Sequence, residues 1–157
     1  MPGDGESAME MRRATKDDLP AIVGLLADDV RGRARDDASL PLDPAYLAAF
    51  EAIDADPMQY LAVAVLDGRI VGTQQLTLIP GIGHKGAWRG QIEAVRIASD
   101  LRGQGLGAEM IGWAVETCRE RGCRMVQLTS DASRLDTHRF YERLGFQKSH
   151  FGFKLTL

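Results

Sequence analysis

The sequence is poor in cysteine, with only Cys118 and Cys123 among its 157 residues. Their spacing fits neither a disulfide framework nor a paired zinc motif. Cys118 falls on the apolar face of an expected helix, and Cys123 lies just past its end. We therefore expect two free, at least partly buried thiols in a reducing cytosol, and predict that the protein is cytoplasmic. The three histidines lack metal-ligand spacing, so no metal site is predicted.

An excess of basic residues and a long apolar run are also missing. The chain has 19 Lys and Arg against 22 Asp and Glu, a formal net charge of -3. Proteins that grip nucleic acid phosphates usually show a basic balance or a basic patch, so nucleic acid is not an expected partner. No apolar run approaches a membrane span, so no membrane partner is expected. Residues 1–10 lack the apolar core of a secretory signal and are expected to be a disordered lead-in.

The remaining residues, 11–157, have the length and composition of one globular domain. An edge strand is expected near Met11. Thr15 with Asp18, and Asp43 before a proline, are N-cap signals that predict helices over residues 16–26 and 44–56. The segment between these helices, residues 31–42, has no periodic pattern and is expected to be a loop.

Strand patterns dominate the middle of the chain. Asp67 and Gly68 between two β-type runs predict a hairpin, and residues 88–97 are expected to add a third antiparallel strand after a loop. Residues 106, 110, 114 and 118 place apolar side chains on one face of a following helix. A strand near residues 125–130, a helix closed by Gly145, and one or two final strands over residues 146–157 complete the expected order.

A glycine-rich turn lies between the strand at 88–97 and the helix that follows it. Gly103, Gly105 and Gly107 alternate with other residues, directly after Arg102. Backbone N–H groups at a helix start, helped by the helix dipole, bind anions and above all phosphates. Arg102 can add a charge-assisted contact. A purely structural helix cap is the alternative interpretation.

Two nucleotide-binding motifs are comparable with this turn. A P-loop would need Lys and then Ser or Thr after Gly107, where Ala108 and Glu109 stand. Gly103, Gly105 and Ala108 match a dinucleotide fingerprint, with Asp131 as the ribose-binding acid. The preceding antiparallel strands and the residues between strand and glycines count against that interpretation, although it stays open.

The stretch "RGQGLG" (residues 102–107) resembles the R/Q-x-x-G-x-G/A signature of the GNAT superfamily of acyl-CoA-dependent N-acyltransferases. "RFYERLGF" (residues 139–146) is similar to a second family segment, and the element order over residues 11–157 agrees. The resemblance implies an α+β, three-layer fold with a mixed, mostly antiparallel sheet flanked by helices and a splayed central strand pair. It implies transfer of an acetyl group from acetyl-CoA to a primary amine of a small molecule or peptide, by direct attack in a ternary complex. A non-catalytic acyl-CoA sensor and an NAD(P)-dependent oxidoreductase are the alternatives.

The resemblance also assigns residues to coenzyme A. The turn would hold the diphosphate, and the strand before it the pantetheine arm. Where many members carry an asparagine seven residues before the family tyrosine, this chain has Arg134, so that contact is in doubt and Ser133 or Arg134 is expected to replace it. The expected cofactor-binding residues are Val95, Arg96, Ile97, Arg102, Gly103, Gln104, Gly105, Leu106, Gly107, Ala108, Ser133 and Arg134.

Two residues are expected to carry proton transfer. An amine must be neutral to attack, so a base is needed. Period-2 alternation places Glu93 on the same sheet face as Val95 and Ile97, which makes Glu93 the first candidate, with an ion-paired surface glutamate as the alternative. Tyr141 matches the family's acid for the departing thiolate; plain core packing is its alternative.

The acceptor site is the least specified part. The loop arginines Arg31 and Arg35, with Arg33 between them, suit a carboxylate or phosphate on the acceptor, unless the loop is merely solvated. Gln75 and Gln91 are polar positions on expected strands near the cleft. Exposed sheet edges make a homodimer a further expectation.

Overall fold

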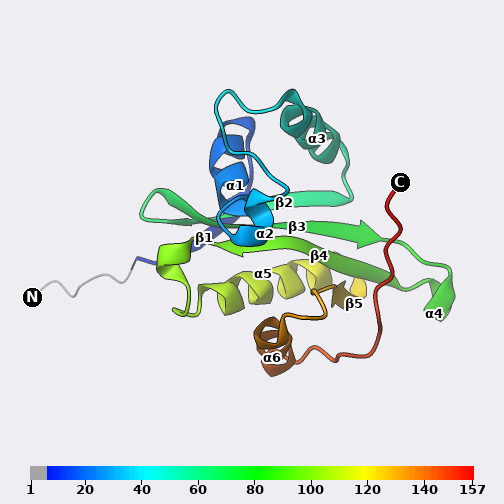
Figure 1. Ribbon diagram of the computed structural model, residues 1–157. Coiled ribbons are helices and arrows are strands. Elements are labelled where there is room, and N and C mark those ends of the chain that lie inside the picture. Colours follow the sequence, from blue (N-terminus) through cyan, green and yellow to red (C-terminus); the bar gives the residue numbers. More distant parts are fainter. Residues whose placement is uncertain (1–6) are drawn as a thin grey trace, which may run out of the picture. The chain divides into compact units, whose positions relative to one another are not determined.

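The computed structural model describes residues 7–157 (Figure 1). By internal contacts the chain separates into two compact units that meet at Gln127 and Leu128, so each unit is described by itself. The prediction of one domain stays a prediction. Residues 1–6 of the predicted lead-in lie outside the described residues, and Glu10 already belongs to the first strand.

The elements follow one another largely in the expected order. The strands are β1 (Glu10–Arg13), β2 (Gln59–Leu66), β3 (Arg69–Ile79), β4 (Trp88–Ile97) and β5 (Cys123–Leu128). The helices are η1 (Lys16–Asp18), α1 (Leu19–Leu26), α2 (Val30–Arg33), α3 (Pro44–Ala55), α4 (Gly83–Gly86), η2 (Ser99–Leu101), α5 (Leu106–Glu120) and α6 (Leu135–Arg143).

The five strands form one sheet in the order β1-β2-β3-β4-β5. Strands β1 to β4 pair antiparallel, and β5 completes a mixed sheet beside β4. The hairpin between β2 and β3 turns on Asp67 and Gly68, both with positive φ, as the Asp-Gly signal predicted. The run of antiparallel strands is not the parallel sheet that a dinucleotide-binding unit requires.

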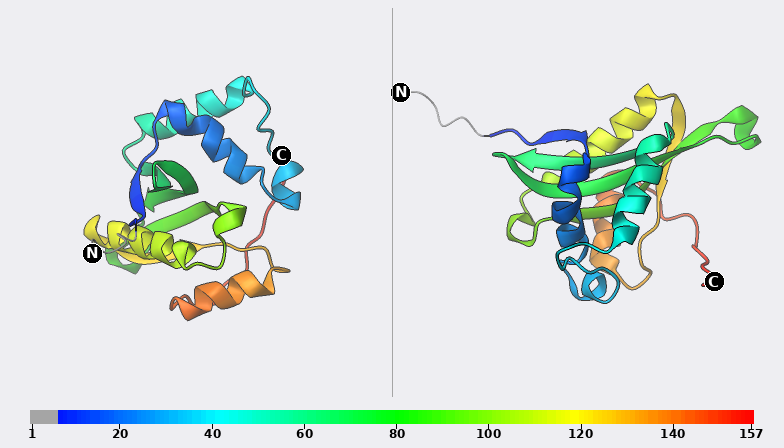
Figure 2. Two further views of the ribbon diagram at one scale, coloured as in Figure 1. Left: turned by 90° about the vertical axis from the view of Figure 1, so that its left-hand side faces the viewer. Right: turned by 90° about the horizontal axis from the view of Figure 1, so that it is seen from above.

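Helices cover both faces of the sheet. Helices α1 and α3 lie on one face and α5 on the other (Figures 1 and 2). The α1 face buries Leu19, Ile22, Phe50 and Val63 in one apolar cluster. The α5 face buries a second cluster around Met110, which packs so closely that a Cβ on Gly72 would lie 2.6 Å from the Met110 sulfur. The predicted apolar face of α5 is confirmed, with Met110, Ala114 and Cys118 fully buried.

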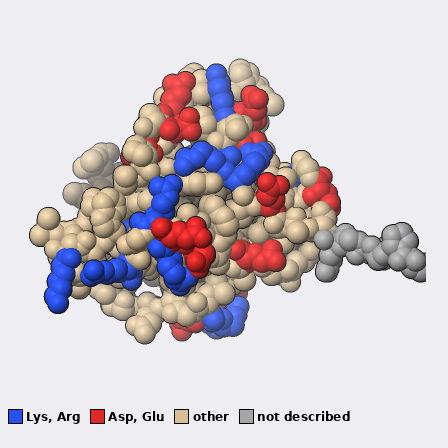
Figure 3. Space-filling model, turned by 180° about the vertical axis from the view of Figure 1, so that it is seen from behind, with Lys and Arg blue, Asp and Glu red and all other residues tan. Residues whose placement is uncertain are grey.

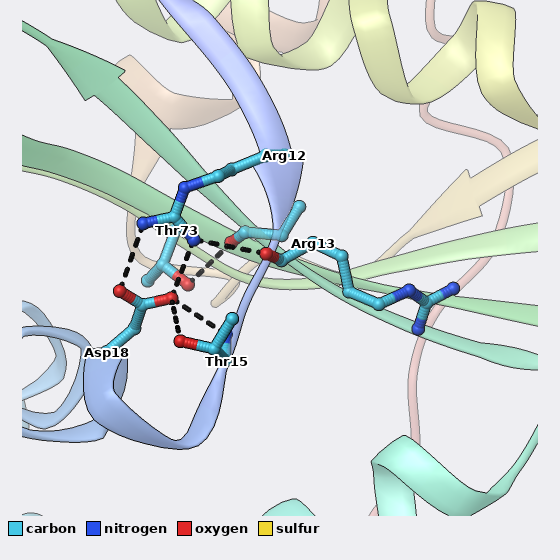
Figure 4. A network of polar contacts seen from close by, with 6 residues as sticks. Arg12, Arg13, Thr15, Asp18 and Thr73 are labelled. Carbon is cyan, nitrogen blue, oxygen red and sulfur yellow. Dashed lines mark hydrogen bonds and ion pairs between the residues drawn. The ribbon is translucent and has the colours of Figure 1, made fainter.

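Polar contacts join β1 to the start of α1 (Figure 4). The Arg12 guanidinium donates to both carboxylate oxygens of Asp18, at 2.7 and 3.1 Å. The Thr15 backbone N–H donates to the same carboxylate at 2.7 Å, which is the reciprocal half of a capping box. Thr73 on β3 donates its hydroxyl to the Ala62 carbonyl at 2.9 Å. The bonds made by the Asp18 carboxylate fix where the chain leaves the sheet edge and enters the first helix.

Two expectations about local structure are wrong. The segment expected to be a loop opens with the short helix α2, because Asp29 accepts the Gly32 N–H as an N-cap. Residues 146–157 form no strand, although Phe151, Phe153, Leu155 and Leu157 alternate as a strand would. Alternation specifies a strand only when a neighbouring edge supplies hydrogen bonds, and all four side chains are exposed.

Candidate active site

The glycine turn takes the backbone shape that its glycines suggest. Gly103 and Gly105 have φ of 80° and 82°, in the left-handed region, and Gly105 is the N-cap of α5. A Cβ at either position would meet nothing within 4 Å, so the requirement for glycine is conformational. Gly107 lies inside the first turn of the 15-residue helix α5. The backbone of the turn is therefore accessible to a ligand, at the N-terminus of a long helix where the helix dipole places partial positive charge.

Strand β4 carries a bulge directly upstream of this turn. In the register of β3 and β4, Thr73 pairs with Arg96 and Gln75 pairs with Glu93. One residue of β3 therefore faces two residues of β4, Ala94 and Val95, and Ala94 has a φ of 53°. A bulge takes backbone groups out of the regular ladder and re-aims side chains, and bulges are frequent beside active sites.

The bulge overturns one expectation about Glu93. Strict alternation would put Glu93, Val95 and Ile97 on one face. Val95 and Ile97 instead pack with Met110 on the α5 face. Glu93 is exposed and pairs across the ladder with Gln75, whose side chain lies on the α1 face. The extra residue in β4 shifts the alternation by one, so the base candidate and the pantetheine-binding candidates lie on opposite faces of the strand.

Arg96 connects the predicted cofactor strand to helix α2. Its Nη1 donates to the Val95 carbonyl at 2.9 Å, and its Nε lies 3.9 Å from the Asp29 carboxylate. The same carboxylate caps α2 through the Gly32 N–H. Asp29, which the sequence did not single out, thus ties the acceptor loop to the strand that carries the bulge.

The acceptor loop itself is largely exposed. Arg31 and Arg33 lie on α2, and Arg35 follows it; all three side chains are exposed. The loop is held to α3 by Tyr46, whose hydroxyl donates to Asp36 at 3.0 Å and accepts the Asp37 N–H at 3.0 Å. The loop's acidic residues therefore serve in part to position it.

The two predicted glutamines lie on the α1 face near Glu93. Gln91 donates its amide to the Glu93 carboxylate. Gln75, opposite Glu93 in the register, donates to the Gln59 side chain at 2.9 Å. The structure thus brings together Gln75, Gln91 and Glu93, on one sheet face.

Tyr141 and its neighbours belong to the second unit, residues 128–157. The Tyr141 ring contacts Phe140 and Phe146 edge to face, at centroid distances of 5.1 and 5.7 Å. Helix α6 ends at Arg143 with Leu144 as its C-cap, and the predicted C-cap residue Gly145 follows one position later, in the left-handed region with a φ of 95°. The ring packing gives the tyrosine a fixed place on its helix.

The segment before α6 is ordered by Asp131. Asp131 accepts from the Ser133 backbone N–H at 2.9 Å and from the Ser133 hydroxyl at 2.5 Å. Its carbonyl accepts the Arg134 N–H at 3.0 Å. The residue proposed as a ribose-binding acid thus shapes the start of α6.

Neither cysteine is suited to carry an acyl group. Cys118 is buried, and burial, with neighbouring Cys123, raises the pKa of its thiol to about 11. Burial also raises the pKa of Cys123. Both are free thiols, as expected. Because thiolates rather than thiols are nucleophilic, the site favours direct attack on the thioester over an acyl-cysteine route.

The surface carries charges of both signs. Basic and acidic side chains are interspersed on the face seen in Figure 3. Among residues 7–157, no group of three His, Cys, Asp or Glu is arranged to hold a metal ion. None of the helices in the described part is both long and apolar enough to span a membrane.

A mixed, mostly antiparallel five-stranded sheet flanked by helices, as seen here, is the fold of the acetyltransferases of the GNAT type. The Acetyltransferase (GNAT) family matches residues 25–146, and the chain belongs to this family. It is an acetyl-CoA-dependent N-acetyltransferase, and membership of this family supports binding of coenzyme A.

Two curated relatives and one solved structure resemble the chain over different shares of its length. It is 30% identical to the aminoalkylphosphonate N-acetyltransferase of Salmonella typhimurium over 149 residues, 94% of this chain and 91% of the relative. It is 38% identical to the glucosamine 6-phosphate N-acetyltransferase of Trypanosoma brucei brucei over 90 residues, 57% of this chain and 59% of the relative. Among crystal structures, a transcriptional regulator from Bacillus halodurans C-125 has 45% identity and a TM-score of 0.92, covering 96% of this chain and 100% of that chain.

Sequence reasoning missed several residues of the site. Asp29 lies just before a segment that the sequence predicts to be a loop, so no pattern singles it out. The bulge at Ala94 does not interrupt the apolar pattern of the strand, so the sequence does not predict it. The sequence also did not single out Gln59, Thr77 and Gln127. Period-2 alternation along β3 alone places Thr77 on the same sheet face as Gln75. Their partnership depends on the strand register, which the tertiary structure sets.

Proposed function

We propose that this enzyme acetylates the primary amine of a small molecule bearing a phosphate or phosphonate group, by direct attack within a ternary complex. The part of the proposal that concerns the acetyl donor depends on the turn at Gly103 and Gly105. This turn lies at the start of α5 and follows the β4 bulge in the chain. The arginine-rich loop and the relatives' named activities support the acceptor half.

The residues present suit coenzyme A. The space beside Gly103 and Gly105 is open, and the N-terminal end of α5 favours a diphosphate. We assign the diphosphate to residues 102–108 and the pantetheine to the backbone of Val95, Arg96 and Ile97. Ser133 and Arg134 are assigned a supporting cofactor contact.

Proton removal from the amine is assigned to Glu93. Acetyl-CoA supplies an activated acetyl thioester, which an amine attacks only in its neutral form. Glu93 is exposed next to the bulge, within a polar rather than an apolar set of side chains. It accepts the ammonium proton, directly or through water. The backbone N–H of Val95, displaced from the regular ladder register by the bulge, stabilises negative charge on the carbonyl oxygen.

Protonation of the leaving sulfur is assigned to Tyr141. The residue matches the family segment, and its ring is held between Phe140 and Phe146. A phenol is a competent donor to a departing thiolate. The C–N bond forms and the C–S bond breaks, and the tyrosinate takes its proton back from the attacking nitrogen, which loses a second proton as it becomes the amide. Glu93 then releases the first proton to solvent.

Arg31 and Arg35 are assigned to the acceptor's anionic group. A guanidinium binds a phosphate or phosphonate through two parallel hydrogen bonds. The named relatives from Salmonella typhimurium and Trypanosoma brucei brucei act on an aminoalkylphosphonate and on glucosamine 6-phosphate, which share an amine and a phosphorus-centred anion.

The test is an acceptor screen with acetyl-CoA and a free-thiol readout. We expect faster thiol release with 2-aminoethylphosphonate and glucosamine 6-phosphate than with ethylamine, and a higher KM for the two anionic amines in the double variant Arg31→Gln/Arg35→Gln. Equal rates for anionic and neutral amines would refute the acceptor assignment.

A second candidate is an acyl-CoA sensor, favoured by the similarity to a protein described as a transcriptional regulator. The same screen separates the two: a sensor binds acetyl-CoA in calorimetry yet releases no thiol with any amine.

We also propose a homodimer and a cytoplasmic location. Strands β1 and β5 are the outer strands of the sheet in the described part, and free thiols suit a reducing compartment. Sedimentation at several concentrations tests the dimer.

A further inference from the structure

A row of polar side chains crosses the sheet on the face that α1 and α3 flank. We call it the glutamine ladder; it consists of Gln59, Gln75, Thr77, Gln91, Glu93 and Gln127. The register aligns Gln59 with Thr77, Thr77 with Gln91, and Gln75 with Glu93. Directly paired residues lie on the same sheet face, so these members from three adjacent strands share one surface.

Hydrogen bonds join the ladder side to side. Gln59 accepts from the Gln75 amide at 2.9 Å and from the Thr77 hydroxyl at 3.0 Å. Gln91 accepts from the Gln127 amide at 2.8 Å and donates to Glu93. The first set holds β2 and β3 together, and the second links β5 to β4 at the base candidate.

These positions would ordinarily be apolar. The helix-covered face of an antiparallel sheet is usually a hydrophobic surface, and its neighbouring positions Leu61 and Val63 do pack in the α1 cluster. Polar residues at such positions either satisfy one another fully or serve a function. Here satisfaction is partial: within residues 7–157, the Gln59 amide nitrogen and the Gln75 and Gln127 carbonyl oxygens have no hydrogen-bond partner.

The unused groups are open to solvent. The buried side-chain atoms that lack a hydrogen bond include none from the glutamine ladder. Gln59, Gln75, Thr77, Gln91 and Gln127 are half-buried, and Glu93 is exposed. The ladder is therefore a polar surface with donors and acceptors still available to a ligand.

The chemistry of the ladder selects a class of ligand. Each carboxamide presents both a donor and an acceptor, as each sugar hydroxyl does. The single charge, on Glu93, attracts an ammonium group, and no cation belongs to the row. We propose that the glutamine ladder is the floor of the acceptor site and binds a hydroxyl-bearing primary amine of the amino-sugar class. This inference rests on the proposed acetyltransferase function and names the class of molecule to which the acceptor amine is attached.

The arrangement also orients the acceptor. Glu93 is the ladder member next to the bulge at Ala94 and Val95, where the acetyl group is to be delivered. When the hydroxyl groups of an amino sugar bind Gln59, Gln75 and Gln127, the amine on the same sugar ring is directed to Glu93. A ring amine without hydroxyls gains only the contact with Glu93.

The kinetic test compares glucosamine with cyclohexylamine, which has a six-membered ring and no hydroxyl. We expect kcat/KM with acetyl-CoA to be at least about tenfold higher for glucosamine, because a bound ring without hydroxyls would cover the ladder's polar groups and leave them unpaired. Gln75→Leu is expected to lower the glucosamine value about tenfold, mainly through KM, and to leave cyclohexylamine unchanged. Gln147→Leu, at an exposed position outside the ladder, is the matched control. If Gln75→Leu fails to fold, Gln127→Leu replaces it.

A binding measurement separates this inference from the proposed function. Glucosamine is titrated into 15N-labelled enzyme with coenzyme A present, and the side-chain amide signals of the ladder glutamines are followed. Shifts of these signals, with none at Gln147, support the ladder as the binding surface even if no amine is acetylated, a result that would refute the proposed function alone. Thiol release at equal kcat/KM with both amines, together with unshifted ladder signals, would overturn the inference and leave acetyl transfer intact.

Discussion

At the residue scale, the position of Glu93 shows how one extra residue redirects a side chain. The bulge at Ala94 puts Glu93 with Gln75 and Gln91, while Val95 and Ile97 pack against α5. A base at Glu93, as proposed, would lie on the face opposite Val95 and Ile97 and would receive the acceptor from the other side of the strand. This separation suits direct attack, in which two substrates approach one carbonyl carbon.

We expect Glu93→Gln to lower kcat/KM by about 10²-fold near neutral pH, a usual contribution of general base catalysis. The loss should shrink as pH rises, since the free amine then needs no base. Rates measured from pH 6 to 10 check this. A loss of the same size at every pH would remove Glu93 from the base role.

Tyr141→Phe removes only a hydroxyl from a ring that keeps its contacts with Phe140 and Phe146. The variant is expected to turn over at least about tenfold more slowly, because the thiolate leaves unprotonated. Calorimetry should show nearly unchanged acetyl-CoA affinity. Unaltered turnover at all pH values would exclude the acid role.

At the element scale, the start of α5 combines the turn proposed to bind coenzyme A with a long helix that is buried along one face. The left-handed Gly105 caps the helix, while Met110, Ala114 and Cys118 fix it against the sheet. The helix is therefore held by its apolar face, and its N-terminal turn is left open.

Gly105→Ala should destabilise the fold by about 1–2 kcal/mol, the usual cost of a left-handed conformation for a residue with a Cβ. We also expect weaker coenzyme A binding, because the turn would relax. Thermal melts and calorimetry measure both effects.

Gly112→Ala is the matched control for this change. Gly112 lies in the interior of the same helix, where a Cβ would meet nothing within 4 Å. Alanine there should stabilise the protein by about 0.5–1 kcal/mol and leave coenzyme A binding intact. An equal loss of coenzyme A affinity in both variants would show that coenzyme A binding does not depend on the left-handed conformation of the turn.

At the scale of the whole molecule, the Arg12–Asp18 pair ties the sheet edge to the first helix. The hydrogen bond from Arg12, followed by those from Thr15, holds the pKa of Asp18 below its ordinary value despite burial. A carboxyl with a lowered native pKa stabilises the fold at pH values above its unfolded pKa, about 3.9. That stabilisation disappears as pH falls through the lower, native pKa.

Asp18→Asn is expected to lower the free energy of unfolding by about 1–2 kcal/mol at pH 7, because Arg12 loses a charge-assisted partner. The difference from wild type should narrow below about pH 4, where the Asp18 carboxyl of the unfolded chain becomes protonated, and should vanish below the lower, native pKa. Denaturant titrations between pH 3 and 7 measure it. Asp17→Asn, at an exposed neighbouring position, should change little, and a difference between Asp18→Asn and wild type that is independent of pH would contradict the assignment.

The sequence by itself determined the elements whose causes are local. The caps at Thr15 and Asp43, the Asp67-Gly68 hairpin, the apolar face of α5 and the left-handed glycines at 103 and 105 are set by a few adjacent residues. Backbone sterics and short-range hydrogen bonds act within one or two turns of chain, so the sequence displays them directly.

The tertiary structure alone decided which residues share a face and which strands form. The bulge at Ala94, the link from Asp29 to Arg96 and the polar row from Gln59 to Gln127 depend on cross-strand register and on segments distant in sequence. The alternating apolar residues after Gly145 form no strand in the structure, although their local pattern is that of one. The free energy of strand pairing and of register comes from contacts between segments that are distant in sequence. The sequence of one segment therefore does not determine them.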